Sequence, residues 1–161
     1  MLTLKIKYAL KHEKAVAPIN RTIGDWFDLQ VVNSAKLDPL ESFKFSLGFA
    51  MELPKGYVAR ISPRSSLYIK KRLMLANSEG KVDNTFKGDR DIWHTVLVNV
   101  SNTITTVKAG DALVQMEIGL SPKATMWQKI KHLLYSKIEF IEVPLLNNNN
   151  RGGYGTTNGY N

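Results

Sequence analysis

The sequence of 161 residues contains no cysteine, and this absence excludes several kinds of chemistry. Without cysteine there is no disulfide, no thiol nucleophile and no cysteine-based zinc or iron–sulfur site. The three histidines, His12, His94 and His132, are too scattered to suggest a metal cluster. No apolar run approaches the roughly 18 residues of a membrane-spanning helix, and the opening residues do not resemble a signal peptide. We therefore expect a cytoplasmic protein without a membrane partner.

Negative charge is also scarce relative to positive charge. The chain has 22 Lys and Arg against 14 Asp and Glu, so its net charge is +8. A positive balance of this size suits polyanionic partners such as nucleic acid, nucleotide phosphates or an anionic membrane surface. The length predicts one domain that is large enough to bury a core.

Short strand-like segments separated by turn signals make up most of the chain. Apolar and polar residues alternate from Leu2 to Tyr8, which predicts a half-buried strand. Many short strands at this spacing predict an all-β sandwich, barrel or jelly roll. The further predicted strands cover residues 28–32, 42–47, 56–61, 93–100, 112–118 and 138–143.

One segment has a helical pattern instead. From Pro122 to about Lys137, apolar residues recur at helical spacing, with lysines elsewhere around the helix. We expect a surface helix whose apolar stripe packs on the body of the protein or on a neighbouring subunit. A basic amphipathic helix that binds a membrane or nucleic acid is the alternative. The stripe consists of Met126, Trp127, Ile130, Leu133 and Leu134.

Four patches carry residue types that suit nucleotide chemistry, and each also has a purely structural interpretation. Pro63–Leu67 places a guanidinium beside two hydroxyls, donors that suit phosphate oxygens, or it is a strand-to-turn junction. Gly80–Gly88 predicts a tight hairpin with one carboxylate and one aromatic ring, or only a solvated hairpin tip. Gly110–Gln115 ends in the polar side chain of Gln115, which suits nucleotide chemistry, or it is only a turn and strand. The glycine-rich tail from Arg151 offers a cation, a ring and hydroxyls, or is a disordered terminus.

Taken in order, these patches and an earlier segment resemble the five motifs of the trimeric dUTPases. The motifs are Gly24-Asp-Trp-Phe-Asp-Leu29, Pro63-Arg-Ser-Ser66, Gly80-Lys-Val-Asp83 to Gly88, Gly110-Asp to Gln115, and Arg151-Gly-Gly-Tyr-Gly-Thr-Thr157. The resemblance spans the chain except for the helical segment near 123–137, which looks like an insertion. The first and last motifs are most similar to phage and Bacillus-type members, and a phage-encoded protein would act in the host cytoplasm.

The resemblance implies an all-β, jelly-roll-like (β-clip) fold, with residues 1–146 as a β domain and 147–161 as a flexible, glycine-rich lid. It implies a homotrimer whose three active sites lie at subunit interfaces and draw motifs from all three chains. The family hydrolyses dUTP to dUMP and pyrophosphate with Mg²⁺, which keeps uracil out of DNA and supplies the thymidylate precursor.

The resemblance makes Asp83 the catalytic carboxylate. An aspartate with a pKa near its reference value of about 3.9 is ionised at neutral pH and can deprotonate an attacking water. That water attacks the α-phosphorus, and pyrophosphate leaves with its charge held by Mg²⁺ and protein donors. Asp28 is expected to help organise the hydrated metal through water. We expect no protein side chain to bind the metal directly.

The resemblance also implies which residues bind the substrate. Uracil presents an acceptor at O4 and a donor at N3, whereas cytosine presents the reverse, so a site built for one rejects the other. The base would meet Asn77 and the backbone of Gly80, Lys81 and Val82, and the ring of Phe86 would exclude a ribose 2′-hydroxyl. In the tail, Tyr154 would stack on uracil and Arg151 would reach the γ-phosphate. The other phosphate-binding and lid residues are Arg64, Ser65, Ser66, Gln115, Gly155, Thr156 and Thr157.

The chain departs from the family pattern at several positions. Phe86 and Phe27 stand where tyrosine is usual, and Lys81 places a charge near the base pocket where an apolar residue is common. Ala112 replaces the usual arginine after Gly-Asp, so we expect its supporting ion pair to be absent. Arg151 lies closer to the stacking ring than in most members.

Two other functions remain open. A dCTP deaminase has a related fold and shares Arg-Ser-Ser-Leu, but it needs a glutamate after the hairpin, where this chain reads Asp89-Arg-Asp-Ile-Trp-His94. A dCTP deaminase also lacks the glycine-rich tail. A regulatory protein on the same scaffold would use the positive charge and the basic helix to bind DNA or a partner protein, and its DNA binding would be salt-sensitive.

Overall fold

The computed structural model describes residues 2–20 and 24–153. Most regular structure in these ranges is β-strand, with two short helices. In chain order the elements are β1 (Leu2–Leu10), β2 (Ile19–Asn20), β3 (Phe27–Gln30), β4 (Ala35–Leu37), β5 (Ser42–Ser46), β6 (Phe49–Glu52), β7 (Tyr57–Pro63), α1 (Ser66–Lys71), β8 (Leu73–Leu75), β9 (Gly80–Asp83), β10 (His94–Asn99), β11 (Thr105–Val107), β12 (Ala112–Leu120), α2 (Met126–His132) and β13 (Tyr135–Glu142).

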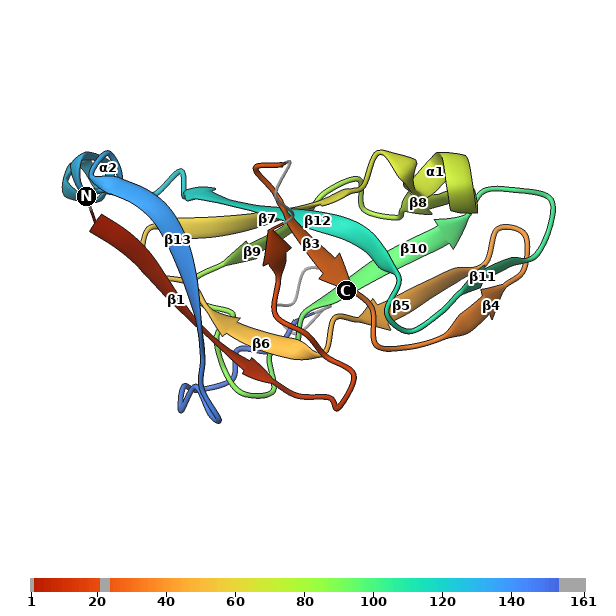
Figure 1. Ribbon diagram of the computed structural model, residues 1–161, viewed down its shortest axis with the longest axis horizontal. Coiled ribbons are helices and arrows are strands. Elements are labelled where there is room, and N and C mark those ends of the chain that lie inside the picture. Colours follow the sequence, from red (N-terminus) through yellow and green to blue (C-terminus); the bar gives the residue numbers. More distant parts are fainter. Residues whose placement is uncertain (1, 21–23, 154–161) are drawn as a thin grey trace, which may run out of the picture.

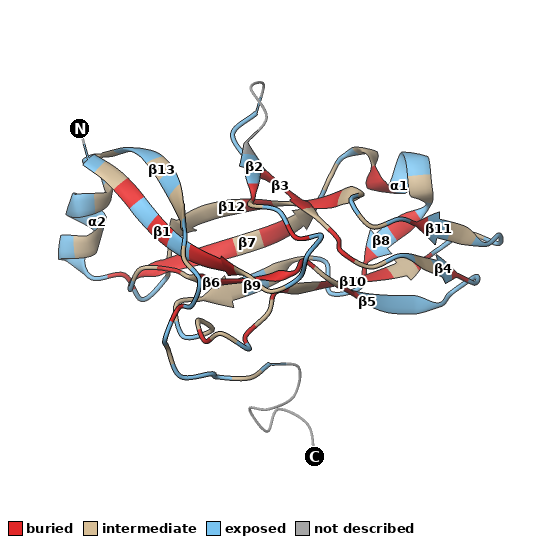
Figure 2. Cartoon of the chain, turned by 60° about the horizontal axis from the view of Figure 1, so that its bottom comes forward, coloured by how far each residue is buried: buried red, intermediate tan, exposed pale blue. Residues whose placement is uncertain are grey.

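The strands form several sheets that share one large hydrophobic core (Figure 1). The largest sheet has the order β2-β3-β12-β7-β9, and the others are β13-β1-β6, β5-β10-β8 and the pair β11-β4. Figure 2 shows that buried residues are concentrated on strands such as β1, β6 and β7, whereas α2 carries none. The helices α1 and α2 lie at opposite ends of the molecule (Figure 1). The all-β architecture predicted from the strand pattern is confirmed.

The first strand shows how the sequence pattern becomes a packed element. Leu4, Ile6 and Tyr8 are buried, and the lysines between them are exposed, as period-two alternation predicts. β1 pairs in parallel with β13 and antiparallel with β6. The end of β13 therefore lies beside β1, where the N–H of Val143 donates to the carbonyl of Tyr8 at 2.9 Å.

Strands β7 and β12 lie inside the largest sheet, and two groups of predicted site residues lie near opposite ends of β7. They pair antiparallel along the whole of β7. On the other edge of β7, β9 places Asp83 opposite Val58. Arg64 follows β7 six residues after Val58, and a strand rises about 3.3 Å per residue, so these two points are roughly 20 Å apart.

Several short elements were not predicted from the sequence. Strands β4, β6, β8 and β11 have three or four residues each, too few for an alternation to stand out. The helix α1 follows Pro63, where we expected a turn at most. Its only buried residue is Leu67, so no apolar stripe marks it, and it ends at Arg72, which has a left-handed φ of 54°.

The helix predicted from Pro122 to about Lys137 is shorter than expected. It begins with a capping box, in which Thr125 and Gln128 bond each other's backbone N–H, and covers only Met126–His132. From Tyr135 onward the chain belongs to β13, because pairing with β1 competes successfully with the helix.

The predicted packing of the helix on this chain is also wrong. None of the residues of α2 is buried, and Trp127 of the stripe is 79% exposed. The helix is held by polar contacts instead. Gln128 Nε2 donates to the carbonyl of Lys55 at 2.9 Å, and the His132 ring lies 3.1 Å from the Tyr57 hydroxyl. Packing of the stripe on a neighbouring subunit stays a prediction. Within residues 2–20 and 24–153, no helix is long and apolar enough to span a membrane.

Candidate active site

Strand β9 and the turn after it line a cavity of about 270 Å³. Five of the residues that we predicted to contact the base or the sugar lie in its wall, namely Asn77, Gly80, Lys81, Val82 and Phe86. Tyr154, predicted to stack on the base, lies outside the described residues. Trp93, just before β10, and His94, its first residue, complete the wall together with Arg151 and the glycines that follow it. Trp93 and His94 were not predicted, because no motif that we recognised includes them.

The predicted hairpin at Gly80–Gly88 is wrong in its second half. β9 is an edge strand paired with β7, and in the described chain no strand follows it before β10. The chain turns instead, with the N–H of Phe86 donating to the carbonyl of Asp83 at 3.2 Å. The Asp83 side chain stabilises this turn itself by accepting the N–H of Thr85, as aspartates in turns commonly do.

Asp83 is kept ionised by its neighbours. Its Oδ1 accepts hydrogen bonds from the N–H of Thr85 at 2.9 Å and from Thr85 Oγ1 at 2.5 Å, and Arg151 Nη1 lies 3.5 Å away. Partial burial raises the pKa of Asp83, but the Thr85 hydrogen bonds and the charges of Arg151 and Lys123 lower it more. The net pKa lies below its ordinary value. The side chain is 48% exposed, so a charged carboxylate at neutral pH is accessible to water.

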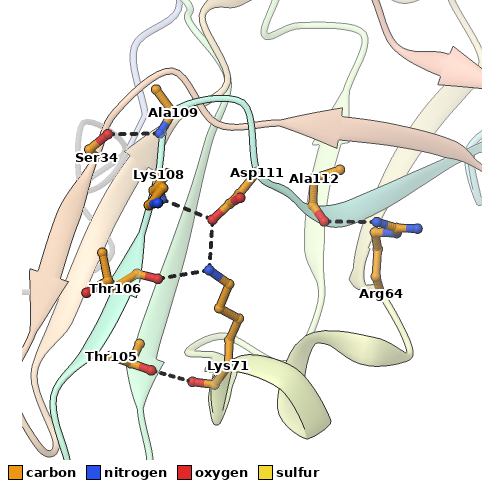
Figure 3. Close-up of polar contacts among 9 residues, drawn as sticks. All are labelled: Ser34, Arg64, Lys71, Thr105, Thr106, Lys108, Ala109, Asp111 and Ala112. Carbon is orange, nitrogen blue, oxygen red and sulfur yellow. Dashed lines mark hydrogen bonds and ion pairs between the residues drawn. The ribbon is translucent and has the colours of Figure 1, made fainter.

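A second group of predicted residues gathers beyond the far end of β7. Asp28 on β3 is the register partner of Gln115 on β12. Arg64 Nε lies 3.0 Å from Asp28 Oδ1, and Arg64 Nη1 donates to the carbonyl of Ala112 at 3.1 Å (Figure 3). The first, second and fourth motifs therefore meet within one chain, and the guanidinium is oriented by a buried carboxylate.

A groove of about 250 Å³ lies beside this second group, with Arg64 and Ser66 in its wall. Lys71 of α1 also lines it and donates to Asp111 Oδ2 at 3.0 Å (Figure 3). Nothing in the sequence motifs had pointed to Lys71, which forms an ion pair next to Ala112, where the usual arginine is missing. Ser65 is the N-cap of α1, yet its hydroxyl makes no capping hydrogen bond.

The arm after β13 passes the loop that follows β9. The carboxylates of Asp89 and Asp91 accept backbone N–H groups of the arm, and Arg151 thereby comes within 3.5 Å of Asp83. We had considered this loop only as the place where a deaminase would have a glutamate, so the role of both aspartates was missed. Four residues predicted for the lid, Tyr154, Gly155, Thr156 and Thr157, lie outside the described residues.

Solved structures share this architecture. The dUTPase of Streptococcus mutans covers 70% of this chain and 94% of its own, with a TM-score of 0.64 and 20% identity. The dUTPase of phage phi11 of S. aureus covers 75% of this chain and 94% of its own, with a TM-score of 0.63 and 20% identity. At these identities the likeness shows the fold, which is the jelly-roll-like β fold expected from the motifs. The fold therefore places this protein in the class of dUTPase-fold proteins.

The family follows from sequence comparison. A dUTPase family model matches residues 16–149. The SPbeta prophage-derived deoxyuridine 5'-triphosphate nucleotidohydrolase of Bacillus subtilis is 33% identical over 156 residues, covering 97% of this chain and 98% of the relative. The deoxyuridine 5'-triphosphate nucleotidohydrolase of Finegoldia magna is 35% identical over 159 residues, covering 96% and 99%. The chain belongs to the dUTPase family, as the five motifs indicated.

Proposed function

We propose that Asp83 is the general base with which this dUTP diphosphatase hydrolyses dUTP to dUMP and pyrophosphate. One observation carries the proposal. An accessible carboxylate with a lowered pKa ends strand β9, and this strand with its flanking turns lines the cavity with five of the residues assigned to base and sugar. Membership of the dUTPase family supports the same substrate.

The contacts of Asp83 suggest which of its oxygens takes the proton. Thr85 and Arg151 both approach Oδ1, and none of these contacts uses Oδ2. We assign Oδ2 to accept a proton from the attacking water, whose oxygen then bonds to the α-phosphorus. The bond from this phosphorus to the bridging oxygen of the β-phosphate breaks, and pyrophosphate leaves with the negative charge. Arg151 brings positive charge to the phosphate nearest Asp83, and its contact with the γ-phosphate stays a prediction.

The cavity provides a physical basis for selecting uracil and deoxyribose. Asn77 can offer both a donor and an acceptor to the base edge. The ring of Phe86 forms one wall, and Gly153 approaches it so closely that a Cβ there would lie 3.2 Å from the ring. A 2′-hydroxyl packed against this ring would lose its hydration without gaining a partner, which disfavours UTP.

The donor set fits a magnesium ion that arrives with the substrate. In the described chain no three His, Asp or Glu side chains are grouped so that they could hold a metal. Mg²⁺ commonly keeps several waters and binds through one or two carboxylates together with substrate phosphates. Asp28, which is paired with Arg64 at the phosphate end, would hold such an ion through water. When bound, the ion would neutralise charge on the phosphates and so assist departure of pyrophosphate.

The distance between the two groups of site residues supports sites shared between subunits. Asp83 lies opposite Val58, whereas the Arg64 guanidinium pairs with Asp28, whose register partner Gln115 lies opposite Ser62. Ser62 is roughly 13 Å further along β7 than Val58, beyond the reach of a triphosphate whose α-phosphorus is at Asp83. We therefore propose a homotrimer in which Arg64, Ser65, Ser66 and Gln115 of one chain complete the site begun by Asp83 of another. Residues 1–146 would form the β domain, and residues 147–161 the lid over each site.

Replacing Asp83 with asparagine tests the base assignment. Asp83→Asn keeps the size and hydrogen-bonding capacity of the side chain but cannot take the proton, so we expect kcat to fall by about 10²–10⁴-fold. Binding of dUTP, measured by calorimetry, should largely survive. Asp38→Asn, in an exposed turn, is the matched control and should keep full activity. Undiminished turnover by Asp83→Asn would reject the assignment.

A further inference from the structure

A second cavity, of about 530 Å³, also has Asp83 in its wall. Lys81 lines this cavity as well as the base cavity, so the two adjoin along β9. The rest of the wall comes from the turn between β6 and β7, the turn after β9 and residues between Ser121 and Gln128. The last of these segments contains the start of the insertion near 123–137, so none of the five motifs accounts for it.

The second cavity is lined by positive charge. Lys81 pairs with Glu79 at 3.1 Å. Lys55 and Lys123 also line the cavity, and neither of them forms an ion pair in the part of the chain that the structure describes. Two ammonium groups without a carboxylate partner there thus share this space with Asp83. Such a space suits a ligand that carries phosphate oxygens.

The backbone around Lys123 is fixed by a tight turn. The N–H of Ser121 donates to the carbonyl of Gly56 at 2.8 Å, and the N–H of Lys123 donates to Ser121 Oγ at 3.2 Å. The next residue, Ala124, is buried, and its N–H donates to the carbonyl of Ser121 at 2.9 Å. The side chain of Lys123 therefore starts from a defined point at the cavity wall.

The sheet register brings this turn close to Asp83. Val58 of β7 lies opposite Asp83 on one edge and opposite Gly119 of β12 on the other. Neighbouring strands are about 4.8 Å apart, so Gly119 is roughly 10 Å from Asp83 across β7. Lys123 follows after the turn, and its flexible stem lines the cavity that it shares with Asp83. Partial burial raises the pKa of Asp83, whereas the charge of Lys123 is among the influences that lower it, so the ammonium group acts on this carboxylate.

We propose that Lys123 is a further substrate-binding residue, whose ammonium group binds the α-phosphate beside Asp83. The physical reason is charge balance. Attack on the α-phosphorus brings an anionic phosphate next to an ionised carboxylate, and like charges that are so close repel each other. A cation that lines the same cavity offsets this repulsion and forms a charge-assisted hydrogen bond with a phosphate oxygen. The inference rests on the proposed function, because Asp83 marks the place of the α-phosphorus only as the general base.

Binding of dUMP and deoxyuridine tests the contact without any assay of turnover. The two ligands differ only in the phosphate. Lys123→Met keeps the length of the side chain without its charge, so it should weaken dUMP binding by on the order of tenfold and leave deoxyuridine binding unchanged. Ligand-observed NMR titration measures both, even where binding is weak. Lys129→Met, on the exposed helix α2 and outside the cavity, is the matched control and should change neither.

The outcomes of this titration are decisive for a variant that keeps the cooperative unfolding transition of the wild type. Equal affinity of wild type and Lys123→Met for dUMP would overturn the proposal. An equal loss for dUMP and deoxyuridine would also overturn it, because the effect would then not concern the phosphate. A wild type that binds dUMP no better than deoxyuridine would have no phosphate contact to lose.

The Asp83→Asn chain separates a direct contact from an effect that passes through the carboxylate. Asparagine at this position carries no charge, so nothing remains there for Lys123 to neutralise. If Lys123 binds the phosphate itself, adding Lys123→Met to Asp83→Asn should weaken dUMP binding by a similar factor as in the wild type. A loss that disappears in the Asp83→Asn chain would show that Lys123 acts only on Asp83, against the proposed contact.

Kinetics of dUTP hydrolysis give the consequence for the reaction. Lys123→Met should lower kcat/KM by on the order of tenfold, and Lys123→Arg, which keeps the charge, should retain most of the activity. Unchanged kcat/KM in Lys123→Met would contradict the proposal. If the wild type does not hydrolyse dUTP, the proposed function fails, whereas the comparison of dUMP with deoxyuridine still decides whether Lys123 binds a phosphate.

Discussion

At the scale of single residues, the site depends on how its carboxylates are partnered. Asp83 receives two hydrogen bonds from Thr85, Asp28 pairs with Arg64, and Asp91 accepts backbone N–H groups. These environments are chemically different. The first leaves a carboxylate ionised and accessible, the second orients a guanidinium, and the third anchors a chain segment.

The hydroxyl of Thr85 gives a prediction about pH. Because its hydrogen bond lowers the pKa of Asp83, Thr85→Val should raise that pKa toward its ordinary value. A general base must be deprotonated to work, so activity is lost as the pH falls through its pKa. The acidic limb of kcat/KM should therefore move to higher pH in Thr85→Val and stay in place in Thr85→Ser, which keeps a hydroxyl. A limb that does not move in Thr85→Val would show that this bond does not tune the base.

Single residues also show what the sequence could and could not reveal. The cavity wall formed by Asn77, Lys81 and Phe86 was predictable, because those residues belong to a recognisable motif. Asp89 and Asp91 were not, because the arm groups that they bind are backbone N–H groups more than fifty residues further along the chain, and backbone donors leave no residue-type signal.

At the scale of elements, length decided what could be predicted. The long strands β1, β7 and β12 carry clear alternation or apolar content, whereas the short strands β4, β6, β8 and β11 do not. The end of α2 could not be read from its apolar stripe, because pairing of Tyr135 and later residues with β1 ends the helical run. The stripe itself faces solvent, so its periodicity correctly indicated a helix but not its packing on this chain.

The attachment of α2 leads to a prediction about stability. The Gln128 side chain accepts the N–H of Thr125 at 2.7 Å and donates to the carbonyl of Lys55 at 2.9 Å. Gln128→Ala removes both contacts, and we expect the free energy of unfolding to fall by about 1 kcal/mol. Chemical denaturation measures this. Lys129→Ala, at an exposed position of the same helix, should change it by less than about 0.5 kcal/mol. Equal effects of the two substitutions would mean that these contacts contribute little.

At the scale of the whole molecule, the residues of the proposed site fall into two groups in each chain. The group around Asp83 includes the residues proposed to bind the base and the sugar, and the group around Arg64 includes the proposed phosphate donors. The net charge of +8 suits a tetra-anionic substrate and also draws it toward the molecule. The separation of the two groups along β7 is the reason for proposing that they meet across an interface between chains.

Mixed oligomers test this arrangement. Asp83→Asn and Arg64→Ala should each be nearly inactive alone. If the two groups of a site come from different chains, refolding the variants together creates some sites with a native Asp83 from one chain and a native Arg64 from the other. We expect activity to return in the mixture, in proportion to the statistical share of such sites. Mixing the proteins after separate assembly is the control. No recovery after joint refolding would place both residues in a site made by one chain.

The most direct test of the account is release of pyrophosphate by the purified protein with Mg²⁺, comparing dUTP, dCTP, dTTP and UTP side by side. The cavity around Asn77 and Phe86 predicts rapid release from dUTP and very little from the other three, because each presents a different base edge, an added methyl group or a 2′-hydroxyl. Comparable release from dCTP or UTP would contradict the assignment of base and sugar to this cavity. No release from any of the four would contradict the central role given to Asp83.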